Sequence, residues 1–165
     1  MEAKKNVKAM EKPKRRPPTN ILTDDELKFF YEKILLFCES DGHGYGTFSK
    51  FSKSFLKPFE LCSENYEAKL KEFQKNGQEP PCDTFYFSAI PENGTKAIEG
   101  QLWFRHLRNA FAHNYITKEE GCMVLQDYYK EGKSTKCTLY VKISSFDEFK
   151  ALINRIQEKI NNPKK

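Results

Sequence analysis

Long apolar segments are missing from this sequence. No run of apolar residues approaches the roughly 18 that a membrane-spanning helix needs, and the first residues lack the apolar segment of a signal peptide. We therefore expect a soluble, cytoplasmic protein without a membrane partner. No internal repeat is evident in the 165 residues, and this length is typical of one domain.

Paired cysteines are missing as well. The five cysteines are odd in number, widely spaced and without a Cys-x-x-Cys pair, so they indicate neither a disulfide framework nor a zinc knuckle. We expect reduced thiols packed as small apolar groups, and no metal or cofactor. A cysteine nucleophile paired with His106 or His113 stays open as an alternative, although no local signature supports it. The cysteines are Cys38, Cys62, Cys82, Cys122 and Cys137.

Net positive charge is missing outside the first 20 residues. Residues 1–20 carry seven basic and two acidic residues, whereas the other 145 carry 21 of each sign, so the net charge of +5 resides in this segment. We expect residues 1–20 to form a disordered basic tail that raises affinity for any polyanion without reading its sequence. Residues 21–163 are expected to form a single domain, in which nucleic-acid binding must depend on a local patch.

Hydrophobic periodicity predicts several helices. Thr23-Asp24-Asp25-Glu26 has the form of a capping box, opening a helix expected from Asp24 to Glu39. Another helix is expected over residues 63–75, and Ser145-Phe146-Asp147-Glu148 opens a last helix with one apolar face. Four phenylalanines spaced by three or four residues indicate a further helix, which core packing explains better than base stacking. They are Phe48, Phe51, Phe55 and Phe59.

Strand-like segments are few. Apolar residues in 122–125 and 137–143 flank the turn-like residues 130–134, which indicates a β-hairpin. Residues 77–96 contain three prolines and are expected to form a long connection, with residues 84–87 tucked against the core. Because an isolated hairpin is marginally stable, it should pack on the helices or join the hairpin of a second subunit. The sequence therefore predicts a mainly α fold with a β-hairpin insertion.

The segment 108–115 combines phosphate-binding and proton-transfer side chains. It ends a helix predicted over residues 95–114, whose apolar stripe has the i, i+3, i+7 spacing of Phe104, Leu107 and Phe111. At about 100° per residue, Asn109 and His113 lie about 40° apart on the helix surface, and Arg108 and His113 about 140° apart. The three polar side chains can therefore border one cleft between two helices or two subunits.

The run 104–113 resembles the signature of HEPN-domain proteins, in which Arg is followed four to six residues later by His, often with a polar residue directly after the Arg. Arg108, Asn109 and His113 match these positions. Tyr115 extends the match to the Arg-x4-His-x-Tyr form of HEPN toxins that pair with a nucleotidyltransferase antitoxin. The resemblance implies a HEPN-like helical bundle, with the β-hairpin inserted after the motif helix.

Cleavage of RNA through its own 2′-hydroxyl needs a base, a cation and an acid, and no metal ion. Arginine holds two phosphate oxygens with its planar fork, and histidine titrates near neutrality. The resemblance implies a metal-independent endoribonuclease that leaves 2′,3′-cyclic phosphate and 5′-hydroxyl ends. His113 would be the general acid/base, Arg108 would stabilise the phosphate charge and Asn109 would position them. Accessory candidates for RNA contact are Arg105, His106 and Tyr115.

One motif histidine per chain leaves either the acid or the base missing. A two-fold homodimer with two motifs face to face would supply both, and the resemblance implies such a composite site. It further implies a role in a toxin–antitoxin pair or in defence against phage, with an antitoxin protein as a partner that would modify Tyr115. The alternative is a non-catalytic RNA-binding or dimerising interaction module. A third reading is an interaction protein whose C-terminal helix zips to another helix.

Overall fold

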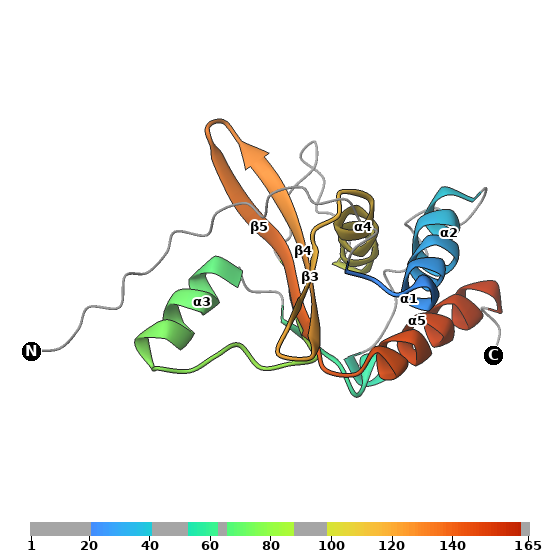
Figure 1. The fold of residues 1–165 in the computed structure, drawn as a ribbon, viewed down its shortest axis with the longest axis horizontal. Coiled ribbons are helices and arrows are strands. Elements are labelled where there is room, and N and C mark those ends of the chain that lie inside the picture. Colours follow the sequence, from blue (N-terminus) through green and yellow to red (C-terminus); the bar gives the residue numbers. More distant parts are fainter. Residues whose placement is uncertain (1–20, 41–52, 63–65, 88–98, 163–165) are drawn as a thin grey trace, which may run out of the picture.

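The computed structural model describes residues 21–40, 53–62, 66–87 and 99–162, and a five-stranded sheet lies at their centre (Figure 1). The strand order is β1-β2-β5-β4-β3. β1 and β2 pair in parallel, and the other neighbours pair antiparallel. The strands are β1 (Glu60–Cys62), β2 (Thr84–Phe87), β3 (Ile116–Glu119), β4 (Cys122–Glu131) and β5 (Ser134–Ile143).

β4 and β5 form the hairpin that the sequence predicts. Met123 pairs with Ile143 at one end of the hairpin and Glu131 pairs with Ser134 at the other. Gly132 makes the turn with a φ of 58°, a backbone conformation that glycine adopts without steric cost. The register shifts between Asp127 and Tyr128, so the regular pairing is interrupted directly beside Asp127.

The sheet shows that the prediction of a mainly α, HEPN-like helical bundle is wrong. Residues 84–87, expected to be part of a connection, are β2, a buried strand paired with β1 on one side and β5 on the other. β3 pairs with the outer side of β4. A lone hairpin leaves two rows of backbone groups unpaired and is marginally stable, and these added strands pair part of each row. The fold is therefore mixed α and β.

The structure confirms the range predicted for the N-terminal helix. α1 (Asp24–Phe29) continues as the π-helical segment η2 (Phe30–Leu35) and then as α2 (Leu36–Glu39). Its capping box is complete, because the Thr23 hydroxyl accepts from the Glu26 backbone N–H at 3.3 Å and the Glu26 carboxylate accepts from the Thr23 N–H at 2.8 Å. These bonds satisfy two backbone donors that the first helical turn leaves without partners.

The phenylalanine-rich segment does not form the expected helix where it is described. η4 (Lys53–Leu56) is a single 3-10 turn, and the chain enters β1 soon afterwards. Phe59 is fully buried and lies 5.4 Å from the ring of Phe85, so its role in core packing is confirmed. Phe48 and Phe51 lie outside the described residues, as does the basic segment 1–20.

The remaining helices follow the predictions closely. α3 (Tyr66–Lys75) begins after residues 63–65, which are outside the described part. α4 (Glu99–Ala112) is the motif helix. It was predicted to begin at residue 95, and residues 95–98 lie outside the described part of the chain. α5 (Phe146–Asn161) begins at the predicted cap, where the Ser145 hydroxyl accepts from the Glu148 N–H at 3.3 Å. In the described part of the chain, every helix is too short or too polar to span a lipid bilayer.

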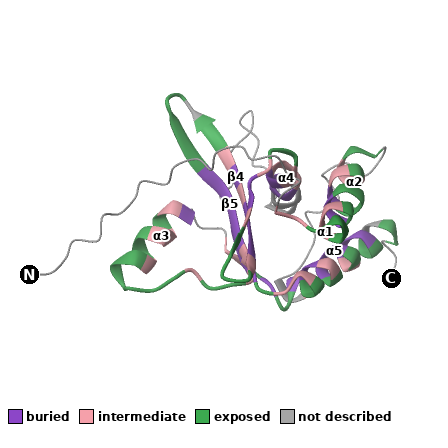
Figure 2. Cartoon of the chain, viewed as in Figure 1, coloured by how far each residue is buried: buried purple, intermediate pink, exposed green. Residues whose placement is uncertain are grey.

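Helices cover both faces of the sheet (Figure 1). α1, α2, α4 and α5 pack on one face around the larger hydrophobic cluster, which includes Phe30, Leu107 and Phe149. α3 covers the other face, where Tyr66 stacks on Tyr140 with ring centroids 4.0 Å apart. Buried residues fill the part of the hairpin between these layers, and its tip is exposed (Figure 2). Asp127 lies where the buried part ends.

Candidate functional site

The motif helix α4 packs its apolar stripe against the sheet. Leu107 and Ala110 are fully buried, and Phe111 stacks on Phe30 with ring centroids 5.4 Å apart and planes 11° apart. The side chain of Phe104 lies outside the described part. This packing fixes the rotation of α4, so its polar side chains face a defined part of β4 and the end of α2.

The end of α4 is a Schellman motif that leaves His113 exposed. The Asn114 N–H donates to the Phe111 carbonyl at 3.0 Å, and the Tyr115 N–H donates to the Ala110 carbonyl at 2.8 Å. Asn114 has a φ of 54°, the left-handed conformation that this motif requires. His113 is the residue just before this turn, and its side chain is directed to solvent.

Asp127 of β4 joins two polar residues of α4. Its carboxylate accepts a hydrogen bond from His106 Nδ1 and another, at 3.2 Å, from Asn109 Nδ2. Asp127 is 3% exposed and His106 is 4% exposed. A buried carboxylate without partners is strongly destabilising, so these two donors account for its place at the interface of helix and sheet.

Arg108 is held from two directions. Its Nη1 donates to Asn109 Oδ1 at 3.1 Å, and its Nη2 donates to Glu39 Oε1 at 2.7 Å. The Arg108 side chain is 29% exposed and that of Glu39 is 50% exposed. A chain of polar contacts therefore runs from the buried Asp127 through Asn109 and Arg108 to solvent at the end of α2.

His106 lies among one aromatic and two polar side chains, those of Phe87, Asp127 and Thr138. Its ring lies 5.5 Å from the ring of Phe87, and the Thr138 hydroxyl lies 3.4 Å from its Nδ1. His106 Nε2 is buried and has no hydrogen-bond partner among the described residues. His106 is therefore inside the protein, bonded to Asp127, and does not lie on a surface that RNA could reach.

The other accessory candidates differ in exposure. Tyr115 is 4% exposed, and its ring lies 5.1 Å from that of Tyr128 and 6.0 Å from that of His113. Arg105 is half-buried on α4. The structure thus joins Arg108, Asn109 and His106 in one network and leaves His113 exposed at the end of the same helix.

Sequence reasoning missed Asp127 and Glu39. In a strand, residues two apart point to the same face, so Leu125, Asp127 and Tyr129 alternate with Val124 and Gln126 along β4. An acidic residue in phase with the buried Leu125 was a sign that its carboxylate faces the core and needs partners. Glu39 carried no comparable sign, because its partner is distant in sequence.

Burial also changes the chemistry of a thiol beside this network. Burial raises the pKa of Cys38 to about 12, although the positive charge of Arg108 acts against this. The Cys38 thiol therefore stays protonated at neutral pH and is a poor nucleophile. This argues against Cys38 in the cysteine-nucleophile reading. Within the described residues, no group of His, Cys, Asp and Glu side chains is arranged to hold a metal ion.

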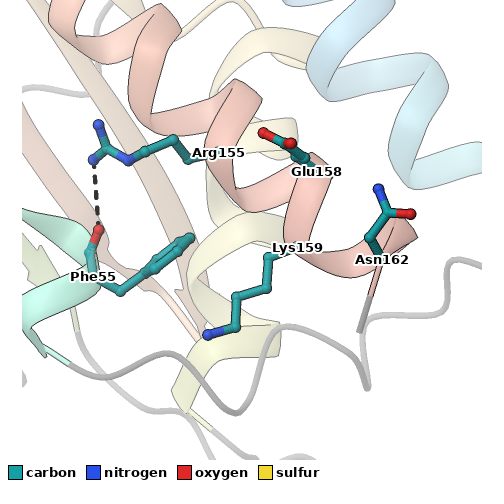
Figure 3. A pocket seen from close by; sticks show the side chains of 5 residues that line it. All are labelled: Phe55, Arg155, Glu158, Lys159 and Asn162. Atoms are coloured by element: carbon teal, nitrogen blue, oxygen red, sulfur yellow. Dashed lines mark hydrogen bonds between the residues drawn. The ribbon is translucent and has the colours of Figure 1, made fainter. Parts of the chain in front are cut away.

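A pocket of about 290 Å³ lies elsewhere, beside the last turns of α5 (Figure 3). Arg155 crosses its wall and donates to the Phe55 carbonyl at 3.5 Å, and Lys159 lies 5.0 Å from the Phe55 ring. Glu158 and Asn162 complete the lining. None of the motif residues takes part, so this pocket is separate from the candidate site.

The candidate site combines the partly exposed guanidinium of Arg108 with the exposed imidazole of His113, which follows it by five residues. A guanidinium binds phosphate oxygens through charge-assisted hydrogen bonds, and an imidazole transfers protons near neutral pH. The chemistry that fits this pair is recognition of a phosphodiester with proton transfer. Comparisons of the chain with models of known protein families, with curated proteins and with solved structures found no match.

Proposed function

We propose that this protein is a metal-independent endoribonuclease that leaves 2′,3′-cyclic phosphate and 5′-hydroxyl ends. The observation that carries the proposal is the Arg108–Asn109–Asp127 network beside the exposed His113. The resemblance of these motif residues to those of HEPN-domain proteins supports it. That resemblance also motivates the proposal of a toxin–antitoxin or anti-phage role.

The reaction needs few protein groups. A base takes the proton of the 2′-hydroxyl, the 2′ oxygen bonds to phosphorus, the bond from phosphorus to the 5′ oxygen breaks, and an acid protonates that oxygen. His113 serves as one of these proton-transfer groups. Arg108 binds the non-bridging phosphate oxygens, on which negative charge increases as the pentacoordinate phosphorus forms. Asn109 holds Arg108 through its side-chain oxygen.

The second proton-transfer group comes from a second copy of the chain. His106 is 4% exposed and bonded to Asp127, so it does not offer a second exposed imidazole. A two-fold dimer with the ends of two α4 helices facing each other would place two copies of His113 at one phosphate. Activity per chain should therefore fall when the protein is diluted below its dimer dissociation constant.

The test is cleavage of end-labelled RNA pools in excess EDTA, with the 3′ ends analysed for cyclic phosphate. We expect the wild type to cut and His113→Ala to bind RNA without cutting. Asn162→Ala is a matched control, because it changes another exposed residue at a helix end and should cut as the wild type does. Equal cutting by His113→Ala, at the same purity, would show a contaminating nuclease or a different mechanism.

If none of the proteins cuts while all bind RNA as dimers, the non-catalytic RNA-binding module replaces the enzyme. Binding can be followed by fluorescence anisotropy, and mass by light scattering. Salt titration adds a further check, because phosphate contacts release counterions and make affinity fall as salt rises.

A further inference from the structure

We infer that Asp127 is a positioning residue for Arg108 and that it acts through the side-chain amide of Asn109. This inference rests on the proposed function, because it assigns to Arg108 the role of binding the RNA phosphate. Neither Asp127 nor its strand belongs to the sequence motif. The direction of each hydrogen bond in the network supports this role.

The first step is that Asp127 presents only acceptors. An ionised carboxylate has no hydrogen to donate, and its Oδ2 atom lies 3.2 Å from Asn109 Nδ2 and in contact with His106 Nδ1. With Asp127 only 3% exposed, water does not readily substitute for either donor. The two bonds fix the carboxylate, and the bond from His106 comes from the same helix as that from Asn109.

The second step is that the carboxylate decides which way the Asn109 amide points. An amide has a donating nitrogen and an accepting oxygen, and the two ends exchange places when the group flips. Asp127 requires the nitrogen on its side, because a carbonyl oxygen there would repel it. Asn109 Oδ1 is then turned away from Asp127 and accepts from Arg108 Nη1 at 3.1 Å.

The third step concerns the guanidinium itself. With Nη1 held by Asn109, the orientation of the planar Arg108 fork is fixed, and its Nη2 faces the exposed side where Glu39 now binds it. A phosphate oxygen can take the position of the Glu39 carboxylate, because both are anionic oxygen acceptors. The buried Asp127 thus determines how Arg108 meets the substrate without touching the substrate.

The inference predicts the effect of a one-atom change. In Asn109→Asp, a carboxylate oxygen takes the place of the Nδ2 that donates to Asp127 Oδ2 at 3.2 Å. Two acceptors would face each other, and Arg108 would lose its orientation. We expect a loss of at least about tenfold in the kcat/KM of RNA cleavage, equivalent to 1.4 kcal/mol.

A second change should reverse the first. In the double variant Asp127→Asn with Asn109→Asp, the carboxylate at position 109 accepts from the new amide and still offers an oxygen to Arg108. We expect this exchanged pair to recover most of the lost activity. Asp127→Asn alone keeps an oxygen that can accept from Asn109 and His106, so its loss should be smaller than that of Asn109→Asp. A residue needed only for folding gives no reason for the exchange to restore cleavage.

Asp83→Asn is the matched control. The Asp83 carboxylate also accepts two hydrogen bonds, from the backbone N–H of Ser144 at 2.9 Å and from its hydroxyl. It lies before β2, away from the motif network, and asparagine tolerates its φ of 58°. We expect Asp83→Asn to lower the free energy of unfolding, because a hydrogen-bonded carboxylate is lost. It should leave kcat/KM within about twofold of the wild type.

An activity-independent readout separates this inference from the proposed function. The NMR resonances of the Arg108 guanidinium should shift in Asn109→Asp, return toward the wild-type values in the exchanged pair and stay unchanged in Asp83→Asn. If the wild type cuts no RNA but these shifts occur, the endoribonuclease proposal fails and the positioning stands. If the exchanged pair leaves the resonances where Asn109→Asp puts them, or cuts no better than Asn109→Asp does, the positioning inference is overturned.

Discussion

Glu39 Oε1 lies 2.7 Å from Arg108 Nη2, which bonds the end of α2 to the motif helix. The side chain of Glu39 is 50% exposed, and exposed ion pairs of this kind contribute about 0–1 kcal/mol to stability. Their effect on binding is larger, because the carboxylate occupies a nitrogen that Arg108 would offer to a phosphate. On the proposed function, Glu39 would therefore compete with RNA for Arg108.

Replacing Glu39 with Gln should strengthen RNA binding. The neutral amide accepts more weakly from Arg108, so we expect the dissociation constant for a short single-stranded RNA to fall about threefold or more at low salt. Fluorescence anisotropy in a His113→Ala background measures this without cleavage. The control, Glu120→Gln, removes an exposed carboxylate bound to Lys142 at 3.2 Å and makes the same charge change. Equal affinities of the two variants would contradict the prediction.

Phe85→Ala should strongly destabilise the protein. Phe85 is fully buried in β2 and packs on Phe59 at 5.4 Å, and truncating a buried phenylalanine costs about 3–5 kcal/mol. Urea unfolding followed by circular dichroism gives the free energy of unfolding. Tyr31→Ala, at a residue that is 49% exposed, should change it by less than about 0.5 kcal/mol. Similar values for both variants would mean that residues 84–87 are a surface connection after all.

Asn114→Gly should keep or increase stability. Asn114 has a φ of 54°, where glycine is favoured, and its buried Nδ2 has no hydrogen-bond partner among the described residues. We expect a gain of up to about 1 kcal/mol in the free energy of unfolding, and a loss of about 1 kcal/mol for Asn114→Ala. Asn162 ends α5 with a φ of −128°, so Asn162→Gly should bring no gain. A loss in Asn114→Gly would argue against the left-handed turn.

Stability should depend on pH through Glu26. Burial raises the pKa of the Glu26 carboxyl, but hydrogen bonds from Lys118 and Thr23 and the charge of Lys118 lower it, and the net result is a pKa below the usual value. Because the folded pKa lies below the unfolded one, the ionised form stabilises the fold at neutral pH, and this contribution is lost as pH falls through the folded pKa.

The comparison of wild type with Glu26→Gln across pH tests this contribution. Glutamine keeps the capping-box geometry but not the ion pair with Lys118, which measures 2.7 Å. We expect the wild type to be more stable by roughly 1 kcal/mol at pH 7, and the difference to vanish in acid, below the usual pKa of a glutamate. Thermal unfolding in buffers of matched ionic strength gives this difference. If the difference in stability persists at low pH, it comes from packing and not from the charge of Glu26.

The sequence predicted elements whose signals are local. The capping box at Thr23 marked a helix that ends at Glu39, as the structure shows. The turn at Gly132 marked the hairpin. β1 and β3 are three and four residues long, too short for a periodic pattern to distinguish them from loops. β1 pairs with β2 across a long connection, and β2 pairs with the distant β5, so no local signal joined these strands to the hairpin and the mainly α prediction was wrong.

The candidate site divides in the same way. Arg108, Asn109 and His113 could be chosen from their spacing on one predicted helix; α4 carries the first two, and His113 is the residue directly after its end. Their partners could not, because Glu39 and Asp127 reach the motif only through tertiary packing. The burial of two accessory candidates could not be predicted either. An amphipathic pattern did not show that His106 and Tyr115 would each be only 4% exposed.

The most direct test of the account is cutting of an RNA oligonucleotide in excess EDTA, compared with the same sequence carrying a 2′-deoxyribose at the mapped cleavage position. The proposed endoribonuclease function predicts that the wild type cuts the RNA and leaves a cyclic phosphate. It also predicts that the wild type spares the substituted position and that His113→Ala cuts neither oligonucleotide. Cutting at the 2′-deoxy position, or the absence of cutting in every RNA tried with the wild type, would contradict it.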